Sequence, residues 1–213
     1  MCGRFELKTK FNDLPKVLMK DYPNKLESKY IEQNLIQPFD PILVLKNEGK
    51  MKTTFMSWGL ISPWAKDPFD KNKPRPFNAR SETVAQKNLF KNSWRYKRCL
   101  IPASGFFEKS FRIRKKNYKT FWLGGIWSKW ISSDGSELES CCILTTTPNQ
   151  LLKPIHNRMP VIVPEGMEEK WTENVKNSEE IKSLMPILHC WSANEWIAEE
   201  LNKSRNLQLR LFN

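Results

Sequence analysis

The chain has 213 residues, 39% of them hydrophobic, which is enough for one compact domain with a sizeable core. Its 35 Lys and Arg against 23 Asp and Glu give a net charge of +12. Such a charge attracts polyanions such as nucleic acid, and the alternative interpretation is that it only keeps the protein in solution. No apolar stretch approaches the roughly 20 residues of a membrane span, and charged residues interrupt the first dozen positions, so we expect neither a membrane protein nor a secretory signal.

The five cysteines are odd in number and irregularly spaced. This usage predicts reduced thiols in an intracellular protein, located in the cytoplasm or nucleoid of a bacterium or in the nucleus of a eukaryote. A zinc site built from Cys141, Cys142, His189 and Cys190 is an alternative. Because no C-x-x-C pair occurs and adjacent cysteines on a strand point to opposite faces, we expect no metal and no other cofactor.

The first predicted element is a short helix over residues 11–19. Apolar residues at 11, 14, 17 and 18 have helical spacing, and Pro23 lies just beyond them. Two strand-like runs follow at residues 42–45 and 51–61, with a turn-like segment at 47–49 between them. This arrangement predicts an antiparallel pair of strands.

The segment that follows, residues 67–202, is predicted to contain most of the strands. Residues 67–76 contain three prolines in ten positions and are expected to form a loop. Ser81 is a suitable N-cap for a helix over residues 81–90, with Glu82 in its first turn. Further strands are expected at 98–102, 105–109, 119–127, 140–146 and 159–163, and further helices at 165–173, 178–184 and 194–202. The order predicts an α+β domain with a largely antiparallel, barrel-like sheet.

The opening MCGRF places a cysteine where removal of Met1 would make it the amino terminus. An α-amine has a reference pKa of about 8 against about 10.4 for lysine, so it is the better carbonyl nucleophile at neutral pH. Together with the thiol on the next carbon it forms a 1,2-aminothiol, which can close an aldehyde into a thiazolidine. The same group could instead hydrolyse an amide, with the thiol attacking and the amine serving as base.

Three other segments have the character of site loops. Asn78 and Arg80 lie in FNARSET, directly before the expected helix. Glu108 lies in an aromatic run, where a partly buried carboxyl suits general acid–base chemistry. His156, one of two histidines, precedes a strand with Arg158 beside it. Each also has an ordinary interpretation, as a turn residue, a surface charge or a structural imidazole.

Six ordered motifs make a family resemblance. They are MCGRF, WGLISPW, FNARSET, RCLIPASGFFE, TTTPN and IHNRMPVIV. In this order they closely resemble the SOS response-associated peptidase family, also called the SRAP domain. The resemblance implies one such domain over residues 2–213, with the motifs in 2–164 and a helical ending over 165–213. It further implies a monomer that crosslinks covalently to abasic sites in single-stranded DNA through its N-terminal cysteine, shielding them from strand cleavage.

The resemblance also implies residue roles. Cys2 matches the nucleophile, Asn78 the residue that positions its terminus or the opened sugar, and Glu108 and His156 the acid/base pair. The matching DNA contacts are Arg4, Asn34, Pro38, Trp58, Trp64, Arg80 and Arg158. The two tryptophans among them would stack on a base or brace the groove.

The chain departs from the family where Lys109 follows the motif glutamate in place of the usual Trp, and where the C-terminal WSANEW lacks the family's V-N signature. The expected activity is thiol-dependent abasic-site processing, in the peptidase/hydrolase or lyase class. Two alternatives remain. One is a cysteine hydrolase that processes its own N-terminus, and the other is a non-covalent binder of single-stranded DNA.

Overall fold

The computed structural model describes residues 2–19, 26–175, 177–189 and 191–201. The strands are β1 (Phe5–Leu7), β2 (Gln33–Ile36), β3 (Pro41–Asn47), β4 (Met51–Trp58), β5 (Asn78–Arg80), β6 (Arg98–Ala103), β7 (Gly105–Glu108), β8 (Phe111–Lys115), β9 (Phe121–Ile131), β10 (Glu137–Thr146), β11 (Met159–Pro160), β12 (Ile162–Val163) and β13 (Trp196–Glu200). The helices are α2 (Lys91–Tyr96), α3 (Glu168–Thr172) and α4 (Ser178–Leu184), with short 3-10 helices η1 (Phe11–Asp13), η2 (Lys16–Met19), η3 (Met185–Leu188) and η4 (Ala193–Glu195).

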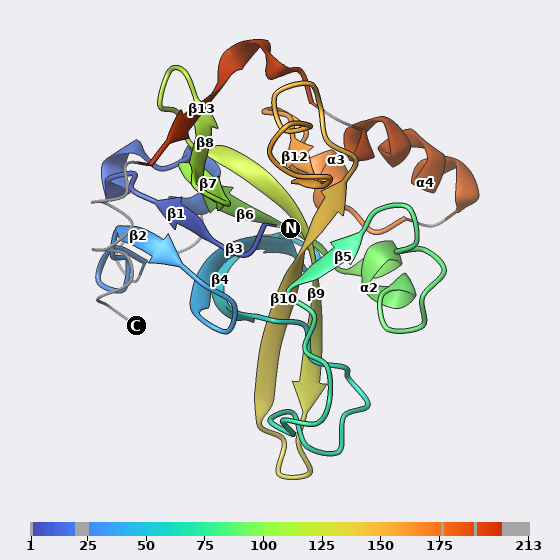
Figure 1. The fold of residues 1–213 in the computed structure, drawn as a ribbon. Coiled ribbons are helices and arrows are strands. Elements are labelled where there is room, and N and C mark those ends of the chain that lie inside the picture. Colours follow the sequence, from blue (N-terminus) through green and yellow to red (C-terminus); the bar gives the residue numbers. More distant parts are fainter. Residues whose placement is uncertain (1, 20–25, 176, 190, 202–213) are drawn as a thin grey trace.

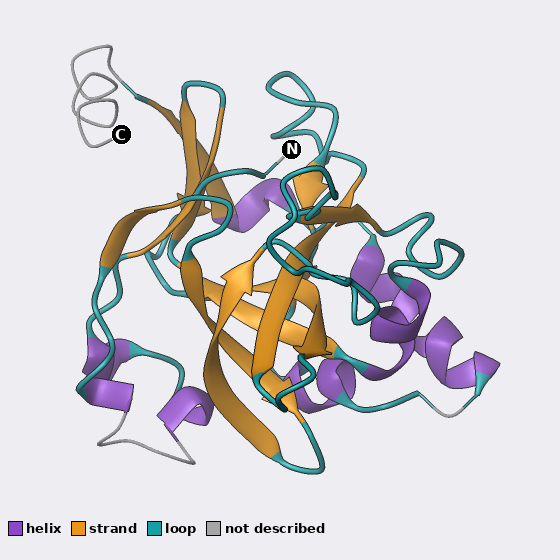
Figure 2. Ribbon diagram, turned by 90° about the horizontal axis from the view of Figure 1, so that it is seen from below, coloured by secondary structure: helices purple, strands orange, loops and turns teal. Residues whose placement is uncertain are grey.

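A closed barrel forms the centre of the molecule (Figures 1 and 2). Its ring runs β10, β4, β3, β6 and β9, and β9 pairs again with β10. A ring with an odd number of strands cannot be antiparallel throughout, and the one parallel pair in this ring is β4 with β10. The α+β class and the largely antiparallel barrel predicted from the sequence are confirmed.

Two glycines on β9 allow neighbouring groups to approach this strand closely. A Cβ atom on Gly124 would lie 2.9 Å from the Trp171 ring, and one on Gly125 would lie 2.9 Å from the Cys142 carbonyl oxygen. Trp171, on α3, is fully buried and donates its indole N–H to the Cys99 carbonyl at 2.8 Å. Helix α3 is thereby fixed against β6.

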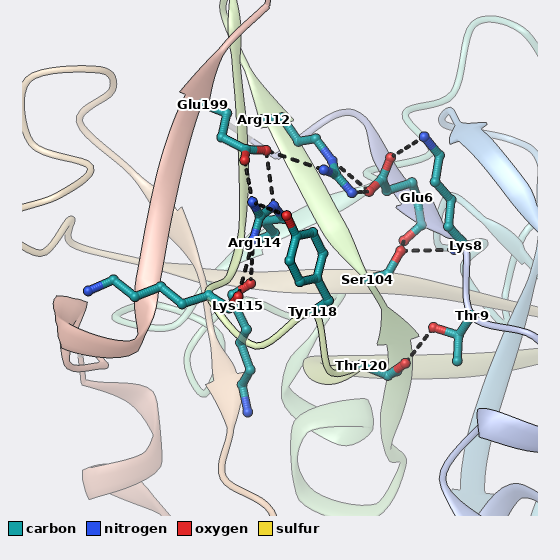
Figure 3. A network of polar contacts seen from close by, with 11 residues as sticks. Glu6, Lys8, Thr9, Ser104, Arg112, Arg114, Lys115, Tyr118, Thr120 and Glu199 are labelled. Carbon is teal, nitrogen blue, oxygen red and sulfur yellow. Dashed lines mark hydrogen bonds and ion pairs between the residues drawn. The ribbon is translucent and has the colours of Figure 1, made fainter.

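A second, open sheet lies beside the barrel, on the side away from α2, α3 and α4 in Figure 1. Its strand order is β13-β8-β7-β1-β2. Figure 3 shows the polar network that holds three of these strands together. Glu6 is fully buried and accepts from Arg112 Nε at 2.8 Å, while Glu199 on β13 accepts from both Arg112 and Arg114.

Three helices predicted from the sequence are wrong. Residues 11–19 form η1 and η2 instead of one helix, because Leu14 is extended before Pro15, as the residue before a proline usually is. Residues 81–90 form consecutive turns, and regular helix begins only at α2. In residues 194–201, η4 and β13 replace the predicted helix, because β13 completes the open sheet against β8. Asn202 lies outside the described residues.

The other predicted elements are confirmed, except that residues 159–163 form two short strands, β11 and β12, in place of one. Strands β3 and β4 form the predicted antiparallel pair around Gly49, which has a φ of 85°. Residues 67–76 form turns and loop, and α3 and α4 lie within the two predicted helical ranges. Among the residues that the structure describes, no helix is long and apolar enough to cross a membrane.

Candidate active site

The N-terminal segment reaches the site along β7. Strand β1 pairs antiparallel with β7, with Phe5 opposite Phe106. The N–H of Phe107 donates to the Arg4 carbonyl at 2.9 Å, so the pairing continues one residue before β1. This register directs residues 2–4 toward the end of β7, where Glu108 lies. Cys2 is fully buried there.

Asn78 holds the backbone of Cys2. It begins β5, which pairs in parallel with β10 of the barrel, and its Nδ2 donates to the Cys2 carbonyl at 2.8 Å. Its Oδ1 is buried and has no hydrogen-bond partner among the described residues. A buried amide oxygen without a donor is costly, and it is suited to accept a hydrogen bond from a group that arrives at this position.

The Cys2 thiol is neutral near pH 7. Burial raises its pKa to about 12, and the negative charge of Glu108 acts in the same direction. The thiolate is therefore a very minor species at neutral pH. In the sequence as given Met1 precedes Cys2, so the nitrogen of Cys2 is an amide until that residue is removed.

Glu108 and His156 form a partly buried pair. Glu108 ends β7, and its Oε1 lies 3.7 Å from His156 Nε2. The N–H of Arg158 donates to His156 Nδ1 at 3.0 Å. Because a backbone N–H can only donate, Nδ1 must be an acceptor, and the ring proton of neutral His156 lies on Nε2, facing Glu108.

Arg158 is clamped by Glu82. Its guanidinium makes a bidentate pair with the Glu82 carboxylate, at 2.6 and 2.9 Å, and also donates to the Thr145 carbonyl at 2.5 Å. The Arg158 bond lowers the pKa of Glu82, so the carboxylate is charged at neutral pH. The clamp fixes the backbone that sets the tautomer of His156.

The structure thus brings the four predicted catalytic residues to one seam. Cys2 and Glu108 come from the open sheet, Asn78 comes from β5 against the barrel, and His156 comes from the loop after β10. Direct contacts link Asn78 to Cys2 and His156 to Glu108, and the charge of Glu108 reaches the Cys2 thiol. Glu82 is a site residue that sequence reasoning assigned to a helix instead. The only available signal was its place in FNARSET.

The predicted DNA contacts differ in accessibility. Asn34 and Arg80 are exposed, Pro38 is partly exposed, and the Trp64 side chain is 65% exposed. Arg4 is partly exposed, and it donates to the carbonyl of Lys109 at 2.9 Å. Lys109, which replaces the usual Trp, lies exposed in the turn between β7 and β8.

Among the predicted DNA contacts, stacking of a base on Trp58 is wrong, and Arg158 is already paired within the protein. Trp58 is fully buried, packs edge-on against Phe5 and donates its indole N–H to the Phe77 carbonyl at 2.8 Å. Its ring is inaccessible to a base, and it braces the wall of the site instead. Arg158 is mostly buried in the clamp with Glu82, so a phosphate would have to compete with that carboxylate.

One cavity of the surface lies away from the four predicted catalytic residues. One cavity of about 860 Å³ is lined by Tyr118, Trp191 and Trp196, and none of the four predicted catalytic residues lines it. Within the described ranges, no three His, Cys, Asp or Glu side chains cluster closely enough to hold a metal ion. Cys190, which belonged to the zinc alternative, lies outside those ranges.

Known proteins similar to this chain include curated relatives and solved structures. The chain is 34% identical over 216 residues to abasic site processing protein YoqW of Bacillus subtilis, covering 97% of this chain and 94% of that protein. It is 36% identical over 190 residues to abasic site processing protein YoaM of the same organism, covering 84% and 81%. The crystal structure of a Bacteroides thetaiotaomicron protein superposes with a TM-score of 0.80 at 25% identity, covering 95% and 93%.

A Bordetella bronchiseptica protein superposes with a TM-score of 0.74 at 18% identity, covering 94% of this chain and all of that one, which shows a shared fold. The family model described as SOS response associated peptidase (SRAP) matches residues 1–204. The chain therefore belongs to the SRAP family.

Proposed function

We propose that this protein processes abasic sites in single-stranded DNA by forming a thiazolidine crosslink through Cys2 once Met1 has been removed. The observation that carries the proposal is the convergence of Cys2, Asn78, Glu108 and His156 on one seam. The names of the relatives support the substrate, since YoqW and YoaM are both abasic site processing proteins.

The crosslink needs two bonds to the same carbon. The free α-amine of Cys2 adds to the C1′ aldehyde of the opened sugar, and loss of water gives an imine. The thiol then adds to the imine carbon, and its proton passes to the nitrogen, which closes the five-membered ring. Because the thiol is protonated at neutral pH, the amine is the group that attacks first.

Glu108 and His156 are placed to move the protons of these steps. The abasic sugar is mostly a closed hemiacetal, so a proton must leave its hydroxyl and another must reach the ring oxygen before the aldehyde appears. His156 presents an N–H toward Glu108 across 3.7 Å, so the two side chains are placed to serve as one acid–base pair. The same carboxyl can then protonate the departing water.

Asn78 suits the orientation of the terminus. Its Nδ2 already fixes the Cys2 carbonyl, and its buried Oδ1 has no donor among the described residues. A free α-amine of Cys2 would supply such a donor on the same residue whose carbonyl is held. Asn78 would thereby hold the amine with its lone pair directed away from the amide oxygen and toward the sugar.

The surface suits a lesion that has no base to read. The net charge of +12 supplies affinity for phosphates without regard to sequence. Arg80 is exposed immediately after the Asn78 segment, and the exposed Trp64 offers a face for a neighbouring base.

The test is a denaturing-gel assay with the purified protein and single-stranded DNA that carries an abasic site, combined with intact mass of the protein. Protein lacking Met1 should give a heat-stable adduct whose mass equals protein plus DNA minus one water. Cys2→Ala and a form with one residue added before Cys2 should give none. An undiminished adduct in either form would refute the thiazolidine.

Self-processing is separated from crosslinking by the same mass measurement. Glu108→Gln and His156→Ala should still lose Met1 in cells, because trimming by an aminopeptidase does not use these side chains. If both variants retain Met1, the catalytic groups act on the protein's own N-terminus, and the hydrolase alternative gains the support that the crosslinking proposal loses.

A further inference from the structure

Phe39 is an aromatic side chain held in an unfavourable backbone conformation at the surface. It lies in the turn between β2 and β3 with a φ of 82°, a region that bulky side chains rarely adopt, and its side chain is 56% exposed. Neither property helps the chain to fold. Strain of this kind persists where the surrounding structure fixes it, and it is common at binding sites.

The ring of Phe39 is fixed in place. Its backbone N–H donates to the Trp58 carbonyl at 2.7 Å, and its ring edge rests on Gly59, where a Cβ atom would lie 3.0 Å from two ring carbons. The Arg75 guanidinium lies over the ring, 5.0 Å from its centroid, and donates to Ser57 Oγ at 2.8 Å. A cation therefore covers one face of the ring, and the opposite face is the one that a base could stack on.

This ring is linked to the candidate active site through Trp58. Strands β1 and β2 pair antiparallel at Phe5 and Ile36. Cys2 lies three residues before Phe5 and Phe39 three residues after Ile36, so both segments leave this pair of strands at the same end. Trp58 connects them, because it accepts from the Phe39 N–H and donates to the carbonyl of Phe77, the residue before Asn78. A cleft of about 550 Å³ opens beside the ring and is large enough for a nucleobase.

The charges that line this cleft balance one another, and cations lie near the Phe39 ring. Lys52 and Lys129 line it, and so do Glu137 and Glu139. The two carboxylates are paired, Glu137 with Lys129 at 2.8 Å and Glu139 with Lys46 at 2.6 Å. Arg75 lies over one face of the Phe39 ring, and the exposed Lys52 lines the cleft. If a base covered the ring, its phosphate would lie near these cations.

We propose that Phe39 is the stacking surface for the base that neighbours the abasic position. The inference rests on the proposed function and adds its substrate requirement: a single strand with an intact, unpaired base beside the lesion. An abasic site offers no base of its own, so any contribution from base stacking must come from its neighbours. Stacking on an aromatic ring accepts every base, because each has a π face.

The experiment couples the ring to the base. Phe39→Gly removes the ring and tolerates a φ of 82°, so the variant should fold at least as well as the parent protein. Fluorescence anisotropy would measure the affinity for two oligonucleotides with a tetrahydrofuran abasic analogue, which cannot be crosslinked. In one the analogue has normal neighbours, and in the other the adjacent positions on both sides are also tetrahydrofuran.

We expect Phe39→Gly to lose about tenfold in affinity for the first oligonucleotide, the typical effect of one stacked base. For the second, the variant and the parent protein should bind equally. Phe39→Trp should restore the loss. Equal losses on both oligonucleotides, or no loss on either, would overturn the proposal.

Tyr118 provides a matched control. It is also an exposed aromatic at positive φ, with Arg114 over its ring at 3.7 Å, but it lies in the turn between β8 and β9, and its hydroxyl accepts from Arg114. Tyr118→Gly should leave both affinities unchanged. Failure of the proposed function would appear separately, as a lack of adduct between the parent protein and true abasic DNA.

Discussion

The barrel and the open sheet are stabilised by different kinds of contact, and each supplies half of the candidate site. Strands β6 and β9 of the barrel bury mostly apolar side chains, such as Leu100 and Leu123. The open sheet encloses a chain of charges that runs from Glu6 through Arg112 to Glu199 (Figure 3). Apolar packing tolerates small shifts, whereas charged hydrogen bonds require a particular geometry.

The difference matters because the proposed catalytic groups meet across the seam between the two sheets. Cys2 and Glu108 move with the open sheet, whereas Asn78 is paired to barrel strand β10. The charge network therefore fixes the position of the nucleophile relative to a rigid wall. We infer that substitutions in the barrel should mainly lower stability, and that substitutions in the open sheet should also lower the rate of adduct formation.

The largest effect is expected at the barrel. Arg98, on β6, is almost fully buried, and its guanidinium donates to carbonyls at the ends of α2 and α3, those of Trp94, Arg95, Trp171 and Glu173. Burial lowers its pKa to about 10, so it is still charged at pH 7. Arg98→Leu should lower the free energy of unfolding by about 4 kcal/mol, because several buried carbonyls lose a charged donor. Urea unfolding measures this loss.

Arg98→Lys is the matched control for that experiment. Lysine keeps the charge but cannot reach carbonyls on two helices with one planar fork, so it should recover only part of the stability. A loss below about 1 kcal/mol in Arg98→Leu would show that water replaces the guanidinium at the helix ends.

The next effect is expected in the open sheet. Glu6→Gln keeps the shape of the side chain but removes the charge that faces Arg112, and should cost about 2 kcal/mol of unfolding free energy. Because Glu6 lies on the strand that leads to Cys2, adduct formation at saturating DNA should also slow, which Arg98→Lys should not cause.

Lys8→Met is the control for this variant. Lys8 reaches Glu6 at 3.3 Å but is exposed, so the unfolding free energy and the rate of adduct formation should hardly change. Equal effects of the two variants would contradict the network.

These charges also show what sequence can and cannot predict. The four proposed catalytic residues could be singled out from the sequence because each lies in a short motif with distinctive neighbours. Glu6 was not, because a charge in FELK resembles any solvent-facing position on a strand. Its burial depends on Arg112, which lies 106 residues away. Trp58 was assigned to DNA for the converse reason, since its motif indicates the site but not which face the ring presents.

The wrong helices have a similar cause. Residues 196–200, WIAEE, tolerate a helix, but pairing with β8 gives their backbone a partner and buries Trp196. At residues 81–90 the expected N-cap, Ser81, donates its backbone N–H to the Thr145 carbonyl, and Glu82 pairs with Arg158. In both segments a long-range contact decides the backbone, and local propensity does not contain that information.

A smaller effect is expected where the two regions touch. Glu82→Gln should release Arg158, loosen the backbone that holds His156 Nδ1, and slow adduct formation about tenfold at saturating DNA, a modest share of the usual effect of acid–base catalysis. The rate is followed by denaturing gel. A purely structural role would lower stability without changing the pH profile of the rate, whereas loss of the His156 tautomer should flatten it.

The control for this variant is Glu165→Gln, an exposed carboxyl outside the clamp. The affinity for DNA must be measured in parallel, because a released Arg158 is also free to bind phosphate. Tighter DNA binding with an unchanged rate would mean that Glu82 restrains a phosphate contact and does not position His156.

The smallest effect is a pH dependence confined to the edge of the open sheet. The hydrogen bond from Arg114 lowers the pKa of Glu199 below the unfolded value of about 4.3. Its stabilising contribution is therefore complete above that unfolded value and is lost as the pH falls through the lower folded value. Because the carboxylate is partly exposed, the loss should be below about 1 kcal/mol.

Hydrogen exchange should show amide protection in β13 falling between about pH 5 and pH 3 while protection in β9 stays constant. Glu199→Gln should remove the difference. A parallel loss in β9 would mean that acid acts on the whole domain, and the charge network would then not be a local device that positions the open sheet against the barrel.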